Sequence, residues 1–146
     1  MRKNVWKAAA AAIAVCMLVM VAASLFIEGC TKMLETTAGN MVPMKCHWVF
    51  VATAIVGIVG LVGALCSFVC STKEGRRVSS ILVAVCAVAA IVLTTSLGIG
   101  ICASAEMACH QKALFVWVPA GIALVIALVQ VVKADLKAAD APKMKL

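Results

Sequence analysis

Four long stretches without a charged residue constrain this chain more than any other feature of its sequence. They cover residues 8–27, 48–70, 78–102 and 113–132. Each reaches the roughly 20 residues that a helix needs to cross about 30 Å of hydrocarbon. All four are continuously apolar, without the alternation of a membrane β-strand, and a helix satisfies its own backbone hydrogen bonds. We therefore predict an all-α protein, a four-transmembrane-helix bundle in which residues 1–146 form a single integral membrane domain.

Composition supports this prediction. Hydrophobic residues make up 65% of the chain, charged residues only 13%, and the mean hydropathy is +1.14. A water-soluble domain of this size needs a polar shell that the chain lacks, so the lipid bilayer is the implied surrounding. The net charge of +7 follows from membrane topology and contact with anionic lipids, and it does not require nucleic-acid binding.

The basic residues predict the orientation of the chain in the membrane. Of the 13 Lys and Arg residues, ten lie before the first stretch, between the second and third, or after the fourth. The other three are Lys32, Lys45 and Lys112. Cytoplasmic loops of membrane proteins are enriched in Lys and Arg. We therefore expect a multi-pass protein of the cell inner (plasma) membrane with both termini in the cytoplasm. The first stretch is longer than the apolar part of a signal peptide, so we expect it to be retained.

The stretches themselves contain no Asp, Glu, Lys, Arg or His. Ion-coupled transporters and proton relays usually place such residues within the membrane. We also find no carboxylate pair, nucleophile-base set or cofactor loop. The sequence therefore argues against a stand-alone pump and against an enzyme.

A short pattern, Met-x-Cys-His, occurs twice just before an apolar stretch. The first copy ends in Cys46 and His47, and the second, 63 residues later, ends in Cys109 and His110. The preceding stretch ends near a cysteine in both cases, at Cys30 and Cys102. These matches suggest two helix-loop-helix repeats in parallel orientation, although little else in the two halves matches.

The four cysteines on the outer side predict two disulfides if they face an oxidising compartment. Four cysteines allow three connectivities. If the two halves are equivalent, the pairs are Cys30 with Cys46 and Cys102 with Cys109. Such bridges would make the outer loops rigid enough to form a recognition surface.

Two other functions compete for the same residues. A set of soft ligands suits Cu(I), or axial ligation of haem, if the two outer loops meet; its members are Met41, Met44, Cys46, His47, Met107, Cys109 and His110. A membrane thiol-disulfide oxidoreductase also has outward cysteine pairs, but its reactive pair is usually Cys-x-x-Cys, which this chain lacks. A cysteine cannot be both a disulfide partner and a thiolate ligand, so these hypotheses are separable.

Small residues recur along the second stretch. Gly57, Gly60 and Gly63 are spaced every third residue, and Gly60 with Ala64 forms a small-xxx-small pair. Such pairs allow two helices to approach closely. The glycine stripe predicts either packing within the bundle or docking to the helix of a partner.

Three segments carry a resemblance to a known family: Met44-Lys-Cys-His-Trp48, Leu97-Gly-Ile-Gly-Ile-Cys102 and Met107-Ala-Cys-His110. Over residues 30–132 the chain resembles a family of uncharacterised small tetraspan membrane proteins of bacteria and archaea. Relatives often carry Thr-Arg-Pro-Ala-Leu after the second Cys-His, whereas this chain has Gln111-Lys112-Ala113-Leu114 and lacks the proline. The resemblance implies no established activity. It implies partnership with ABC-type exporters that have large extracytoplasmic domains.

The sequence thus predicts a non-enzymatic membrane accessory protein, a subunit or regulator of a larger membrane complex such as an ABC-type exporter. The alternatives are an outward-facing copper or haem site and a thiol-disulfide oxidoreductase.

Overall fold

The computed structural model describes residues 2–27, 33–35, 37, 39–43, 45–70, 72–101 and 108–139. Within them lie four helices and a small antiparallel hairpin: α1 (Arg2–Phe26), β1 (Met33–Glu35), β2 (Met41–Pro43), α2 (Lys45–Val69), α3 (Lys73–Thr94) and α4 (Ala108–Ala139). All four helices are long and apolar enough to cross a membrane. The predicted four-helix fold is confirmed.

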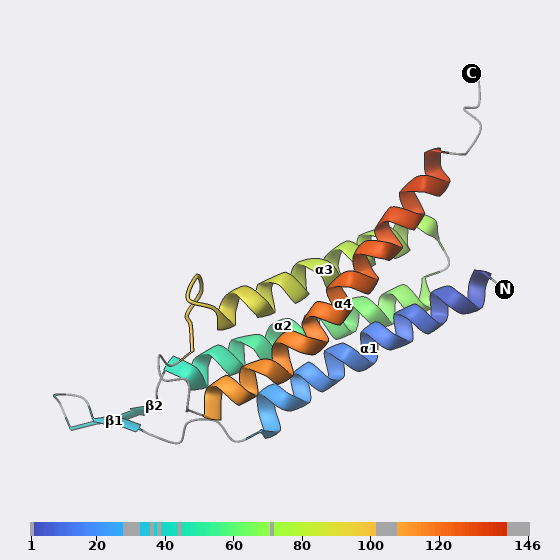
Figure 1. The fold of residues 1–146 in the computed structure, drawn as a ribbon. Helices are drawn as coiled ribbons and strands as arrows, with labels where there is room; N and C mark the ends of the chain where they lie inside the picture. The colour runs from blue at the N-terminus through green and yellow to red at the C-terminus, as the bar shows by residue number, and fades with distance from the viewer. Residues whose placement is uncertain are drawn as a thin grey trace.

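The helices run alternately up and down, each packed against the next, and α4 packs against α1 as well as α3 (Figure 1). The start of α1, the end of α4 and the turn between α2 and α3 therefore lie at the same end of the bundle, which we call the termini end. The starts of α2 and α4 and the hairpin lie at the opposite end, the hairpin end (Figure 1).

Small side chains line much of the core. Ala87 and Ala90 of α3 and Ala120 and Ala123 of α4 are fully buried. The helices can approach closely because alanine adds little bulk at these contacts. Larger core residues, including Met17 of α1, fill the remaining space. The outer faces carry exposed branched aliphatic side chains on every helix, which suits contact with lipid.

The helix boundaries differ from the predicted ones mainly at the hairpin end. The third apolar stretch runs to residue 102, but α3 ends at Thr94. Thr95 takes an extended conformation, and its N–H bonds to the carbonyl of Val92 at 3.1 Å. Gly100 has a φ of +75°, which glycine adopts readily. The fourth helix begins at Ala108, five residues before the predicted boundary, so hydropathy alone misplaced both of these ends.

The hairpin was not predicted from the sequence. Its register pairs Met33 with Pro43 and Glu35 with Met41. Gly39 in the turn has a φ of +78°. The Gly39-Asn40 dipeptide between two short apolar segments is a turn signal that could have indicated it. The hairpin extends away from the helices (Figure 1).

Candidate functional site

The two Met-x-Cys-His patterns occupy equivalent places at the hairpin end. α2 begins at Lys45 and α4 at Ala108, so each cysteine is the second residue of its helix and each histidine the third. The methionines that precede the helices, Met44 and Met107, lie outside the described residues. The 63-residue offset seen in the sequence therefore corresponds to the same local position at the start of two helices.

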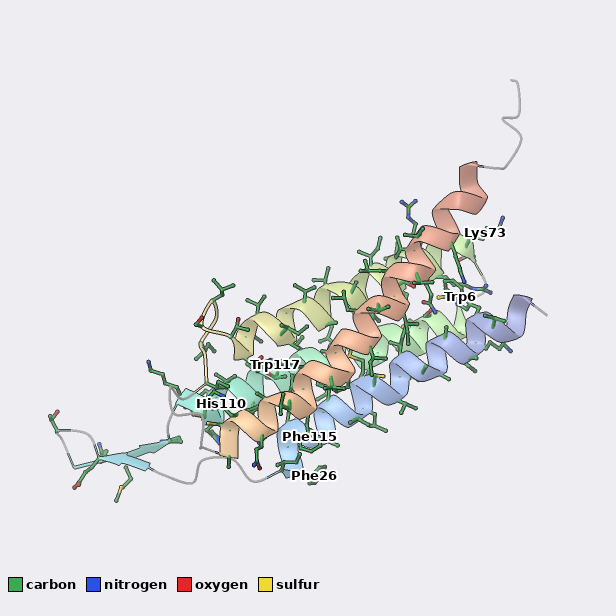
Figure 2. All side chains as sticks on the ribbon, in the orientation of Figure 1. Trp6, Phe26, Lys73, His110, Phe115 and Trp117 are labelled. Carbon is green, nitrogen blue, oxygen red and sulfur yellow. The ribbon has the colours of Figure 1, made fainter. Side chains whose placement is uncertain are left out.

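Cysteine and histidine have different surroundings within each pattern. Cys46 and Cys109 are fully buried in the core of the bundle. His47 is exposed and its ring meets the edge of the neighbouring Trp48 ring, with centroids 5.7 Å apart, while His110 is half-buried (Figure 2). Among the described residues, no three of His, Cys, Asp and Glu lie together as a metal site. Copper or haem binding would need the methionines outside the described residues, and it stays a prediction.

The predicted disulfides likewise depend on residues that the structure does not describe. Cys46 carries a free thiol in the structure, whereas Cys30 and Cys102 lie outside the described residues. Both pairings stay predictions. The buried position of Cys46 and Cys109 also fits cysteine as a small apolar core residue.

A buried lysine lies one turn beyond the second pattern. The ammonium of Lys112 sits 4.5 Å from the centre of the Phe50 ring, a cation–π contact between α4 and α2. Only 5% of Lys112 is exposed. No hydrogen bond or ion pair joins it to another residue in the described part of the chain. The apolar stretch in the sequence begins only at residue 113, but α4 begins at Ala108 and therefore contains Lys112.

The glycine stripe lies inside the bundle. Gly57 faces Val21 and Met20 of α1, and Gly63 faces Leu82 and Val83 of α3. Between them, Gly60 contacts both neighbours, Met17 of α1 and Cys86 of α3, and Ala64 is also buried. The stripe therefore supports packing within the bundle and is covered on both sides.

Polar side chains join α3 to its neighbours. The hydroxyl of Ser80 donates to Oε1 of buried Gln130 on α4 at 2.9 Å, and the hydroxyl of Ser79 donates to the carbonyl of Gly63 on α2. Near the hairpin end, Nε1 of Trp117 donates to the hydroxyl of Thr94 at 2.7 Å. This hydrogen bond between helices was not predicted from the sequence, because it depends on how α4 packs against α3.

Aromatic and basic side chains hold α1 to the other helices at the termini end. The guanidinium of Arg76 lies 5.5 Å from the centre of the Trp6 ring, and the ammonium of Lys7 lies 5.7 Å from that of Phe68. Nε of Arg76 also donates to the carbonyl of Cys70 at 2.9 Å. These contacts give the basic residues at this end a structural role in the packing of α1.

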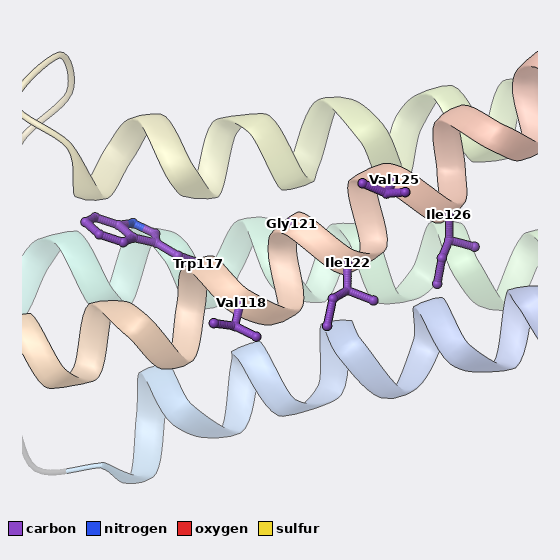
Figure 3. Close-up of a pocket in the computed structure, with 6 residues that line it drawn as sticks. All are labelled: Trp117, Val118, Gly121, Ile122, Val125 and Ile126. Carbon is purple, nitrogen blue, oxygen red and sulfur yellow. The ribbon is translucent and has the colours of Figure 1, made fainter.

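A shallow apolar groove marks the outer face of α4. Figure 3 shows its lining side chains, which all come from this helix: Trp117, Val118, Gly121, Ile122, Val125 and Ile126. A side chain added at Gly121 would meet no atom within 4 Å. The groove is therefore a notch in the lipid-facing surface, and it brings no charged or nucleophilic group together.

The fold and these contacts define a four-helix membrane protein in which two equivalent helix starts share one end of the bundle. The chain belongs to the family described as a domain of unknown function, DUF4418, whose model matches residues 12–133 and so includes α2, α3 and most of α1 and α4. No curated protein and no solved structure matches the chain.

Proposed function

We propose that this protein is a non-enzymatic accessory subunit of a larger membrane complex. Its four helices hold it in the bilayer, and its hairpin contacts the partner. The observation that carries the proposal is that β1 and β2 extend beyond the helices at the hairpin end (Figure 1).

The hairpin has the properties of a contact surface. Each strand has three residues and, within the described ranges, forms a sheet only with the other strand. The outer edge of a short strand offers backbone donors and acceptors to another chain. Met41 in β2 is 65% exposed. An isolated two-stranded hairpin is only marginally stable in water, and contact with a partner would stabilise it.

Many contacts of the helices lie within the bundle itself. The glycine stripe that could have docked a foreign helix is covered by α1 and α3. The hydroxyls of Ser79, Ser80 and Thr94 bond within the bundle. These features support an anchoring role for the membrane part and leave the hairpin as the surface for recognition.

In this proposal, the distribution of the basic residues determines the orientation of the protein in the membrane. Lys7, Lys73, Arg76, Arg77 and Lys133 all belong to the termini end. The positive-inside rule then puts that end in the cytoplasm of the inner membrane and the hairpin outside it. The family resemblance implies partnership with ABC-type exporters, so an exporter with a large extracytoplasmic domain is the first partner to test.

Photo-cross-linking in native membranes tests the proposal. A photoreactive amino acid at Met41 should form an adduct with a larger membrane protein, which mass spectrometry of the band identifies. The control places the same group at Val125 in α4, which is similarly exposed at 61% but lies on the lipid-facing side. Adduct formation at Met41 alone supports the hairpin as the contact. The proposal fails if Met41 gives no adduct and the protein is recovered alone from native membranes.

A further inference from the structure

Gln130 of α4 and Ser67 of α2 each bury a polar atom that needs a hydrogen-bond partner. Only 4% of Gln130 and 3% of Ser67 is exposed. Within the described ranges, neither Nε2 of Gln130 nor the hydroxyl of Ser67 forms a hydrogen bond. Buried polar atoms of native proteins are nearly always paired, because an unpaired one loses its bonds to water and gains none in return. These two atoms therefore point to a ligand.

The side-chain amide of Gln130 indicates what kind of ligand this is. The hydroxyl of Ser80 lies 2.9 Å from Oε1 of Gln130 and 2.9 Å from the carbonyl oxygen of Arg76, but its single proton serves one acceptor at a time. While the hydroxyl donates to Gln130, the unpaired end of the amide is Nε2. While it donates to Arg76, the amide can turn round so that Nε2 donates to the hydroxyl, and the unpaired end is then Oε1. The ligand must therefore be able both to accept and to donate.

Ser67 and Gln130 approach the same turn of α3. The hydroxyl of Ser79 donates to the carbonyl of Gly63, and Ser67 follows Gly63 by four residues, or about one helical turn. The next residue of α3, Ser80, contacts Gln130. Both α2 and α4 pack against α3. The two unpaired atoms therefore lie at the same level of the bundle to within about one turn.

The surroundings suit a ligand of the size of water. Ala64 and Ala127 precede Ser67 and Gln130 by three residues on their own helices, and both alanines are buried. The two residues of α3 at this level are serines, which are also small. Water both donates and accepts, and a buried water typically bonds about three polar groups.

The site is also close to a source of water. Gln130 lies three residues before Lys133, where the spanning part of α4 ends. This separation is about 4.5 Å along the helix. A water molecule therefore needs to pass less than one helical turn from the membrane surface at the termini end.

We propose that a bound water molecule links Gln130 to Ser67 inside the bundle, near the termini end. It bonds the otherwise unpaired end of the Gln130 amide, in either orientation of that amide, and it bonds the hydroxyl of Ser67. The water thereby connects α4 to α2, two helices whose main contacts are with α1 and α3. The site is independent of the accessory function proposed above.

Nuclear magnetic resonance of the isotope-labelled protein in lipid nanodiscs tests the site directly. The measurement is the transfer of magnetisation from water to the side-chain amide protons of Gln130, which we expect in the wild type. Ser67→Ala should weaken this transfer, because the water loses one of its partners. Ser24→Ala is the matched control and should leave it unchanged. Ser24 is also a buried serine with an unpaired hydroxyl in the described part of the chain, but it lies near the end of α1, at the hairpin end.

A double-mutant cycle measures the same link through stability. Gln130→Leu removes the amide, and Ser67→Ala removes the hydroxyl. If one water bonds both groups, the second substitution costs less than it does alone. The unfolding equilibrium constant of the double variant should then differ about fivefold or more from the value for independent effects. Ser24→Ala in place of Ser67→Ala should give additive effects, because distant residues share no partner.

A wild-type protein without transfer from water to the Gln130 amide would overturn the proposal, and this measurement needs no variant to fold. The proposal is equally overturned if Ser67→Ala leaves the transfer unchanged, because Ser67 then does not hold the water. Additive effects of Gln130→Leu and Ser67→Ala would refute a shared water. Coupling of Gln130 to Ser24 as large as that to Ser67 would show only a general loss of packing, and would also refute the site.

Discussion

Replacing Gly57 with alanine tests how closely α2 and α1 pack. The added methyl carbon would lie 2.7 Å from Cγ2 of Val21 and 2.9 Å from Cε of Met20, and real Cβ atoms essentially never show contacts below 3.0 Å. The end of a methionine side chain can move aside at little cost. Valine cannot, because its branched Cβ allows one preferred rotamer in a helix. The two helices must therefore shift apart.

The size of the effect follows from two opposing contributions. Overpacking a well-filled core costs about 1–3 kcal/mol. Replacing glycine by alanine within a helix recovers about 0.5–1 kcal/mol of conformational free energy. We expect Gly57→Ala to lower the free energy of unfolding by about 1 kcal/mol. Gly121→Ala is the matched control, because no atom lies within 4 Å of the added methyl and only the favourable contribution remains.

Equilibrium unfolding in mixed micelles, followed by tryptophan fluorescence, measures both variants. Gly121→Ala should be slightly more stable than the wild type, and the two variants should differ by the overpacking contribution of about 1–3 kcal/mol. If Gly57→Ala gains as much stability as Gly121→Ala, then α1 does not cover the glycine stripe and our account of the packing is refuted.

Three further predictions concern the bundle and its orientation. Ser80→Ala should lower the free energy of unfolding by about 1–3 kcal/mol in the same assay, because it removes a donor to Oε1 of buried Gln130. An unchanged stability would contradict the Ser80–Gln130 hydrogen bond. Thr94→Val should lower the free energy of unfolding by about 0.5–1.5 kcal/mol, because it removes the acceptor for Nε1 of Trp117. Once Thr94 is replaced, the loss of this hydrogen bond should contribute little to the further destabilisation caused by Trp117→Phe. An epitope inserted at Gly39 should bind antibody on intact spheroplasts, whereas one at the C-terminus should need permeabilised membranes; the reverse pattern would invert the proposed topology.

Hydropathy predicted the number and kind of helices, because a span must be continuously apolar and satisfy its own backbone. It misplaced the end of α3. The residues after Thr94 are still apolar enough to extend the stretch, but Thr94 and Thr95 direct their hydroxyls to carbonyls of the last turn. Such local bonds compete with a regular helix, and hydropathy does not register them.

The sequence predicted only part of the candidate site. The repeated Met-x-Cys-His pattern was evident, and its 63-residue spacing matched the two helix starts. Cys46 faces the core and His47 is exposed because of the way α2 is rotated about its axis relative to its neighbours, which the pattern itself does not indicate. The burial of Lys112 depends on Phe50, which is distant in the chain and reaches it only through the packing of four helices.

The position of α4 in the bundle also bears on how the protein is made. Synthesis proceeds from the N-terminus, so α1, α2 and α3 exist before α4 emerges from the ribosome. Only α4 brings Gln130 to Ser80 and the indole of Trp117 to Thr94, and α4 packs against both α1 and α3. A nascent chain that stops after α3 keeps polar side chains without these partners inside the membrane. Completion of the last helix is thus the step that closes the bundle, because a product truncated after α3 leaves uncovered the faces of α1 and α3 against which α4 packs.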